Sequence, residues 1–209
     1  MNFKYHIKKI SAKLSSALFC IRRCKHFLTK TALKTLYFSM FHCHLIYALL
    51  AWGSANKGTL DPIIKKQKNA IRLISHANYN AHTDPLFKEA GILKFEDLYK
   101  FNQIEFMYLY LNDKLPSSFE GVWSKNRENK TLNLRNSGDM YIPRARLEFS
   151  ARLPLHSIPQ VFNNFPDNVL QYSISHEKFK SGLNLFFMNN LPSEVYCGRP
   201  FCQDCFPNQ

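Results

Sequence analysis

The amino-acid sequence predicts a mainly α-helical protein: a basic helical bundle over residues 1–115, an irregular proline-containing segment with one terminal helix over 116–190, and a cysteine-containing tail over 191–209. Two observations predict this class. Apolar residues recur at steps of three and four through most of the first 111 residues, which is the helical period. Helix start and stop signals stand between these periodic stretches. The 209 residues are 45% hydrophobic and 21% charged, an ordinary balance for a globular chain of one or two domains.

The first helix is predicted by a single apolar stripe. Its members alternate at steps of four and three, close to a heptad seam: Phe3, Ile7, Ile10, Leu14, Ala17, Ile21, Cys24 and Leu28. Lysines and arginines fall off this stripe, so one face packs and the others are cationic. Thr29 is expected to cap a second helix that runs to about Ala51 and ends at Gly53.

Two later helices share one start signal, an aspartate that can cap followed by a proline at the first helical position. Asp61-Pro62 predicts a third helix, and Asp84-Pro85 predicts a short one that Gly91 closes. A further helix is expected over about Glu96–Leu111, before the stop at Pro116.

The pattern changes after Ser117. Four prolines argue against long helices between Ser117 and Tyr172, so turns and short extended pieces are expected there: Pro143, Pro154, Pro159 and Pro166. A last helix is predicted from about Ser175, its cap, to Met188.

The positive charge is confined to the first third of the chain. Residues 1–75 contain eleven lysines and three arginines against one acid, Asp61, whereas residues 76–209 contain fourteen basic and fourteen acidic residues. This asymmetry predicts a polyanionic partner for the first third, either nucleic acid or an anionic membrane surface. A solvated basic face with no specific partner is the alternative.

The side chains expected to contact a phosphate backbone lie on the first and third helices: Lys8, Lys9, Lys13, Arg22, Arg23, Lys65, Lys68 and Arg72. Tyr5 or Tyr37 could add base stacking.

No catalytic residues are predicted. The sequence has no GxxxxGK[ST] or GxGxxG loop and no adjacent pair of aspartates. Glu96-Asp97 falls in the first turn of a predicted helix, where carboxylates oppose the helix dipole. No catalytic Ser/His/Asp or Cys/His set can be argued from spacing.

The six cysteines are too sparse for a disulfide scaffold, and no secretory signal precedes them, so an intracellular protein, nuclear or cytoplasmic, is expected. Cys20 and Cys24 are interpreted as buried thiols, and His42-Cys43-His44 as core packing. In the tail, Cys197, Cys202 and Cys205 contain the Cys-x2-Cys half of a zinc site but no evident fourth ligand. Bound zinc or free thiols both fit that spacing.

Residues 35–56 contain no Lys, Arg, Asp or Glu, and this uncharged stretch is long enough to span a bilayer. Polar residues occupy the first half of this stretch, and its densest apolar run, Leu45–Trp52, is short. A buried core helix is therefore expected rather than a membrane span.

Several sequence pieces occur in an order that resembles one family. They are Met1-Asn2-Phe3-Lys4-Tyr5-His6-Ile7, then Lys13, Tyr37, Tyr47 and Trp52-Gly53, then Gln67-Lys68-Asn69-Ala70-Ile71-Arg72, His82-Thr83-Asp84-Pro85-Leu86-Phe87, Gly91-Ile92-Leu93, Val161-Phe162-Asn163-Asn164-Phe165-Pro166, and Ser175 with Phe179-Lys180 and Leu183. The ordered set, over roughly residues 1–190, resembles the post-palm segment of reverse transcriptases from non-LTR retrotransposons, of the LINE type and jockey- or CR1-like. A phenylalanine stands where that family's Trp-Asn-x-Leu-Pro motif has tryptophan.

The resemblance implies a thumb-like helical domain that holds template and primer beside a polymerase palm. It also implies a fragment without activity of its own, because the family's aromatic-Ala-Asp-Asp motif, whose carboxylates hold Mg²⁺, is not in this sequence. Without a palm, either marginal stability or self-association through an exposed stripe of the first helix is expected: Phe3, Ile7, Ile10 and Leu14. A helical interaction protein, an anionic-membrane-surface protein and a relic without function are the alternatives.

Overall fold

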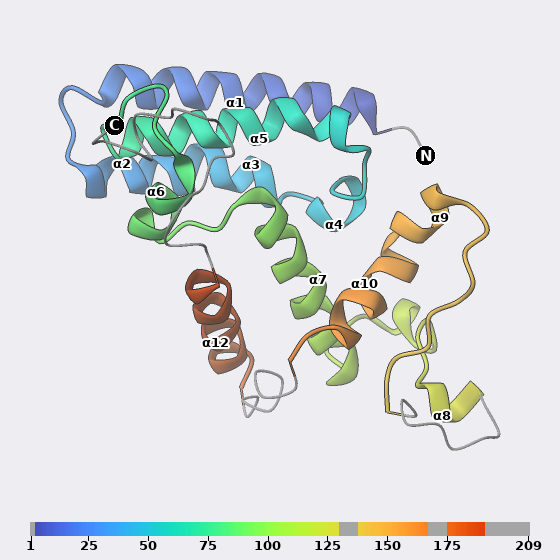
Figure 1. Cartoon of the computed structure of the whole chain (residues 1–209). Coiled ribbons are helices and arrows are strands. Elements are labelled where there is room, and N and C mark those ends of the chain that lie inside the picture. Colours follow the sequence, from blue (N-terminus) through green and yellow to red (C-terminus); the bar gives the residue numbers. More distant parts are fainter. Residues whose placement is uncertain (1–2, 130–137, 167–174, 191–209) are drawn as a thin grey trace, which may run out of the picture. The chain divides into compact units, whose positions relative to one another are not determined.

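The computed structural model describes residues 3–129, 138–166 and 175–190 and confirms a mainly α-helical protein (Figure 1). In these ranges the only β pairing is an isolated antiparallel bridge between Lys125 and Met140. The described residues divide into two compact units, one comprising those up to Asp97 and from Leu185 to Asn190, the other those within Leu98–Asn184. The domain boundary predicted at residue 115 therefore falls within the second unit.

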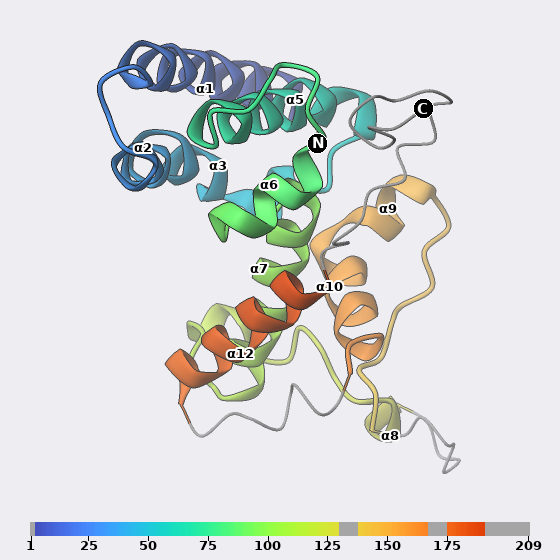
Figure 2. The same cartoon turned by 60° about the vertical axis from the view of Figure 1, so that its left-hand side comes forward.

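The first unit is built from two long helices and a broken run of short ones between them in sequence. Figures 1 and 2 show α1 (Lys4–Cys24) and α5 (Lys57–Ile74) side by side and running in the same direction. The chain returns between them through α2 (Lys30–Leu36), the π-helix η1 (Tyr37–His42), α3 (Cys43–Ile46) and α4 (Leu49–Trp52). The short α6 (Thr83–Ala90) follows α5.

The apolar stripe of α1 is buried inside this unit. Ile7 is 3% exposed, Ile10 5% and Leu14 0%, because the stripe packs against α5, η1 and α3. Burying an isoleucine or leucine contributes roughly 1.5–3 kcal/mol, so this contact is a main source of the unit's stability. The expected self-association through these residues is therefore contradicted by the structure: the stripe finds its partner within the chain.

The second helix is capped as predicted but is not continuous. Thr29 Oγ1 accepts a hydrogen bond from the Ala32 amide at 3.3 Å. The helix then widens into η1 and breaks at Ala48, whose φ of 51° is left-handed. The break leaves the Tyr47 carbonyl outside any helix, where it accepts a hydrogen bond from the fully buried indole of Trp52 at 2.8 Å.

The Asp-Pro signals predicted the right helices but the wrong start positions. Asn56 precedes α5, so Asp61-Pro62 lies inside the helix rather than at its start. His82 precedes α6, which places Asp84 in the first turn. Pro85 is the third residue of α6, where the amide has no carbonyl partner within the helix, whereas Pro62 is the sixth residue of α5 and cannot donate to the Gly58 carbonyl. Asp-Pro therefore marks the first turns of these helices and not their first residue. Gly91 closes α6 in a left-handed conformation, as predicted.

One buried amide joins three parts of the first unit. Gln67 of α5 is 1% exposed. Its Nε2 donates to the Tyr37 hydroxyl at 3.1 Å and to the Leu93 carbonyl at 3.0 Å, and its Oε1 accepts from the Phe95 amide at 2.8 Å. Burial holds the pKa of Tyr37 well above its usual range, so this phenol stays neutral.

The second unit is organised around α7 (Phe95–Leu111), which matches the predicted helix closely. Within this unit α7 lies between α10 (Pro154–Asn163) and α12 (His176–Asn189) (Figure 1). Gln103 of α7 donates to the Ser157 hydroxyl of α10 at 2.8 Å. On the α12 side, the rings of Tyr108 and Phe179 stack with centroids 4.0 Å apart, and Glu105 lies 3.1 Å from the Lys180 ammonium.

Short elements connect these helices: η2 (Ser117–Phe119), α8 (Asn126–Asn129) and α9 (Glu148–Arg152). The last helix begins after Ser175, whose hydroxyl accepts from the Lys178 amide at 3.4 Å, in agreement with the predicted cap.

The expectation that prolines prevent a longer helix between residues 117 and 172 is wrong at α10. Pro154 occupies the first position of this ten-residue helix, where no amide hydrogen is needed. Pro159 lies in its interior and cannot donate to the carbonyl four residues earlier, that of Leu155. This carbonyl instead accepts from the Trp123 indole nitrogen at 3.0 Å, which compensates for the missing helical bond.

We expect Gln67→Leu to lower the free energy of unfolding by about 3 kcal/mol, since it leaves the Leu93 carbonyl, the Phe95 amide and the Tyr37 hydroxyl buried without this partner. Tyr37→Phe removes one of the three bonds and should cost about 1 kcal/mol. Urea unfolding followed by circular dichroism measures both, and equal losses for the two variants would contradict a central role for the amide.

Candidate nucleic-acid interface

The contact between Ser11 and Lys66 fixes which side of α1 faces α5. Lys66 Nζ donates to the Ser11 carbonyl at 2.7 Å and also contacts its hydroxyl. An α-helix turns about 100° per residue, so Arg22, eleven residues after Ser11, returns to within about 20° of it. Lys8, three residues before Ser11, lies about 60° away. Both cations are exposed and lie on the α5 side of α1.

The other predicted cations of α1 lie elsewhere on the helix. His6 packs near Tyr47 and Trp52, with centroid distances of 6.4 and 6.3 Å, which marks the side opposite α5. Lys13 follows His6 by seven residues and therefore lies on that side. Lys9 stands over the exposed Tyr5 ring at 4.9 Å, and Arg23 lies 6.0 Å from the ring of the exposed Phe19. The five cations of α1 thus surround its solvent-facing arc and do not form one stripe.

On α5 the predicted cations also differ in their surroundings. Lys65 is exposed and precedes Lys66, a cation that sequence reasoning did not select. The two side chains point about 100° apart around α5, so Lys65 faces solvent while Lys66 faces α1. Partial burial lowers the pKa of Lys66, in keeping with its place between the two helices. Lys68 faces away from α1 and lines a small cavity with Asp84 and Lys94, which form an ion pair at 2.8 Å.

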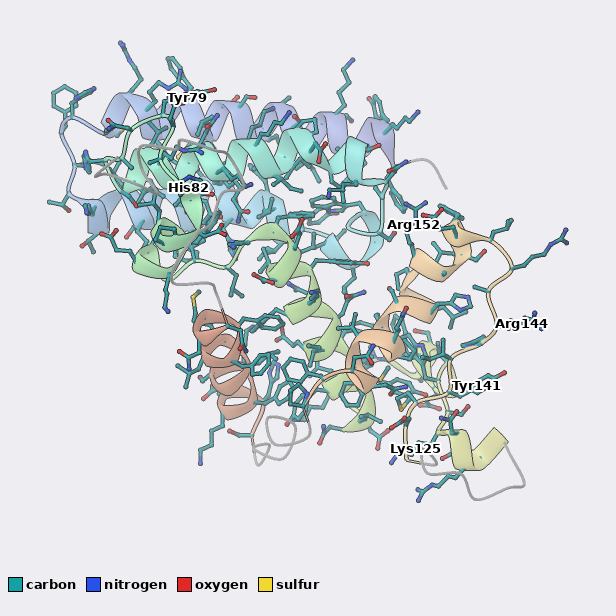
Figure 3. The ribbon with its side chains drawn as sticks, in the orientation of Figure 1. Tyr79, His82, Lys125, Tyr141, Arg144 and Arg152 are labelled. Atoms are coloured by element: carbon teal, nitrogen blue, oxygen red, sulfur yellow. The ribbon has the colours of Figure 1, made fainter. Side chains whose placement is uncertain are left out.

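Arg72 has a structural role. Its Nε donates to the Ala81 carbonyl at 2.9 Å and its Nη1 to the Asn69 side-chain oxygen at 3.3 Å. Its guanidinium also lies 6.0 Å from the ring centroid of Tyr79, labelled in Figure 3 on the loop between α5 and α6. These contacts fix the loop, so less of this side chain is available to a ligand than the sequence suggested.

The structure therefore brings together part of the predicted set. We call Lys8, Arg22, Lys65 and Lys66 the seam surface. Lys8, Arg22 and Lys66 border the contact between α1 and α5, and Lys65 extends this surface over the solvent-facing side of α5. Lys8 and Arg22 are separated by about 21 Å along the helix axis. Within the described residues, the ion pairs involve other cations: Lys30, Lys94, Arg152, His176 and Lys180. None of these five is a member of the seam surface.

The two tyrosines proposed for stacking have different environments. Tyr5 is 70% exposed and can receive a base. Tyr37 is fully buried, so the prediction of a stacking role for it is wrong. The reason is that Tyr37 lies on the inner side of η1, where Gln67 holds its hydroxyl.

The cysteines proposed as zinc ligands, Cys197, Cys202 and Cys205, lie outside the described residues. Within the described ranges, no three His, Cys, Asp or Glu side chains are grouped so that they could hold a metal ion. Cys20 and Cys24 are half-buried thiols, and both partial burial and the neighbouring Cys24 raise the pKa of Cys20. Glu96 and Asp97 lie in the first turn of α7, the position expected for carboxylates that oppose its dipole.

The uncharged stretch over residues 35–56 folds into η1 and short helices of the first unit. Over the ranges that the structure covers, every helix is too short or too polar to cross a membrane. No protein-family model, curated protein or solved structure matches this chain.

His42 offers a test of the packing in η1. Burial lowers the pKa of its imidazole below the ordinary 6.5, and its Nδ1 is buried without a hydrogen-bond partner in the described part of the chain. Because the unfolded chain binds this proton more readily, stability should fall as the pH drops from about 6.5 toward the folded-state pKa. His42→Phe keeps a ring beside Tyr37 and Phe38 and should flatten this dependence in urea unfolding between pH 7.5 and 5.5. If the free energy of unfolding of this variant depends on pH as steeply as that of the wild type, groups other than His42 cause the dependence.

Proposed function

We propose that this chain binds nucleic acid through the seam surface of its first unit and has no catalytic activity of its own. The observation that carries the proposal is that Lys8, Arg22 and Lys65 are exposed on the seam surface without a carboxylate partner in the described structure. Cations held by rigid helices attract phosphates without reading sequence. The fourth member, Lys66, keeps the two helices in register through Ser11.

The resemblance to the post-palm segment of non-LTR retrotransposon reverse transcriptases supports the same proposal. It makes a template–primer duplex the expected ligand and a polymerase palm the expected protein partner. In that setting the chain acts in the nucleus or cytoplasm as part of an RNA-directed DNA polymerase. Zinc at Cys197, Cys202 and Cys205 remains part of the proposal for the tail.

One observation favours protein binding as a second candidate function. Apolar side chains on η1, α3 and the residue that follows are exposed: Phe38, Met40, Ile46 and Tyr47. Singly exposed apolar residues are common on protein surfaces, whereas several within one short segment suit a protein contact. This second candidate predicts that the first unit binds a protein partner. It also predicts that the chain does not bind nucleic acid in a salt-sensitive way.

The proposal is tested by neutralising the seam surface in the full chain with Lys8→Gln, Arg22→Gln and Lys65→Gln together. Binding to a labelled RNA–DNA duplex is measured by fluorescence anisotropy at several salt concentrations. If all three side chains contact phosphates, the slope of log K against log salt should become shallower by up to about 2.7, since each phosphate contact contributes about 0.9. Affinity should fall at least tenfold at moderate salt.

A matched control removes three exposed cations from other helices, with Lys88→Gln, Lys100→Gln and Lys178→Gln. It changes the net charge equally and should weaken binding much less. Equal losses for the two triple variants would reject a localised interface. Wild-type binding to phosphatidylserine vesicles without duplex binding would instead favour the membrane-surface alternative.

A further inference from the structure

The second unit contains a cationic segment that the charge balance of the sequence hides. Residues 76–209 have equal numbers of acids and bases, yet five of the chain's nine arginines fall between residues 125 and 152: Arg127, Arg135, Arg144, Arg146 and Arg152. Arg144 and Arg146 lie on the segment that leads into α9, and Arg152 is the last residue of α9. We call residues 141–147 the arginine strap.

The strap is fixed at several points along its backbone. Where it begins, the Tyr141 amide donates to the Ser124 carbonyl at 2.8 Å. One residue earlier, the side-chain amide of Asn163 on α10 binds both the amide and the carbonyl of Met140, at 2.9 and 2.8 Å. Further along, His156 Nδ1 lies 3.1 Å from the Pro143 carbonyl. The strap therefore lies along α10 in a defined conformation, which lowers the entropy lost when it binds a ligand.

Side chains alternate along the strap as they do along a strand. Tyr141, Pro143 and Ala145 are half-buried, whereas Ile142, Arg144 and Arg146 are exposed. The backbone bends at Arg146 and Leu147, so strand geometry does not extend to Arg146. The Cα atoms of Arg144 and Arg146, two residues apart, are nonetheless separated by no more than about 7 Å. Arg144 and Arg146 thus present two neighbouring guanidinium groups to solvent. Figure 3 shows Lys125, Tyr141, Arg144 and Arg152 following one another along this part of the unit.

Charge compensation on the strap is weak. In the described part of the chain, Arg144 and Arg146 form no ion pair, and Arg152 approaches Glu148 only to 3.9 Å. Guanidinium groups bind phosphate oxygens through two parallel hydrogen bonds, which an ammonium cannot do. Two such groups, exposed two residues apart in the chain, suit successive phosphates of a single nucleic-acid strand.

We propose that the arginine strap is a second nucleic-acid contact, in which Arg144 and Arg146 bind neighbouring phosphates of a single strand. It is separate from the seam surface in sequence, in unit and in composition, because the seam is mostly lysine. The two surfaces would then differ in ligand: the seam suits the dense charge of a duplex, and the strap suits a single strand.

The test uses the full chain and a labelled 20-nucleotide single-stranded RNA, with binding measured by anisotropy over a salt series. The double variant Arg144→Gln, Arg146→Gln should lose about tenfold in affinity, and its slope of log K against log salt should become shallower by about 1.4, or 0.7 for each contact on a single strand. The matched control, Lys100→Gln with Lys178→Gln, removes the same charge from exposed positions of α7 and α12 and should stay within twofold of wild type. Circular dichroism and urea unfolding show whether each variant keeps the wild-type fold.

Equal losses for the strap variant and its control, or no loss for the strap variant, would overturn the proposal. So would a strap variant that loses affinity for phosphatidylserine vesicles but keeps its affinity for RNA. The triple seam variant, measured on the same RNA and on the duplex, separates this proposal from the proposed function. If both proposals hold, the seam variant loses duplex affinity and the strap variant loses affinity for the single strand. A seam variant that loses duplex affinity while the strap variant keeps its RNA affinity rejects the strap. A strap variant that loses RNA affinity while the seam variant keeps its duplex affinity supports the strap and rejects the seam.

Discussion

The buried amide of Gln67 is the interaction on which the first unit depends. It joins the middle of α5 to the π-helix through Tyr37 and to the start of α7 through Leu93 and Phe95. A buried amide that lacks its partners costs far more than a satisfied one contributes, so this network admits one arrangement of the three segments. The π-helix at Tyr37–His42 is consistent with this single arrangement. In it the Tyr37 ring is buried and its hydroxyl accepts the hydrogen bond from the Gln67 amide.

In the second unit, the hydrogen bond between the Trp123 indole and the Leu155 carbonyl likewise joins separate segments. Pro159 removes one hydrogen bond from α10, and the indole of Trp123 supplies a donor to the carbonyl that is left over. The Tyr110 hydroxyl in turn donates to the Trp123 carbonyl at 2.6 Å. α7 and α10 are thereby connected through the segment after η2, and Asn163 and His156 of α10 hold the arginine strap.

These packing constraints decide which cations can act together. α1 has cations around its whole exposed arc, but only those beside Ser11 border α5, since Lys66 bonds there. Lys65, Lys68 and Arg72 follow one another at steps of three and four residues, the spacing of one helix face. In the structure, however, Arg72 is bound to the loop before α6 and Lys68 faces a small cavity. The seam surface and the arginine strap differ accordingly: the seam is mostly lysine on helices, whereas the strap has two exposed arginines on a segment whose backbone is hydrogen-bonded to its neighbours.

The sequence by itself determined the helical class, the apolar stripe of α1, the caps at Thr29 and Ser175, the end of α6 at Gly91 and the extent of α7. Each depends on periodicity or on a short-range hydrogen bond, which neighbouring residues specify. Only the tertiary structure decided that the α1 stripe is buried within the chain, that the second helix breaks at Ala48, that Tyr37 is internal and that proline-containing α10 forms. These outcomes depend on partners far away in sequence, such as Ile63 of α5 in the core, Gln67 and Trp123, and local pattern contains no information about which distant group will satisfy a carbonyl or cover an apolar face.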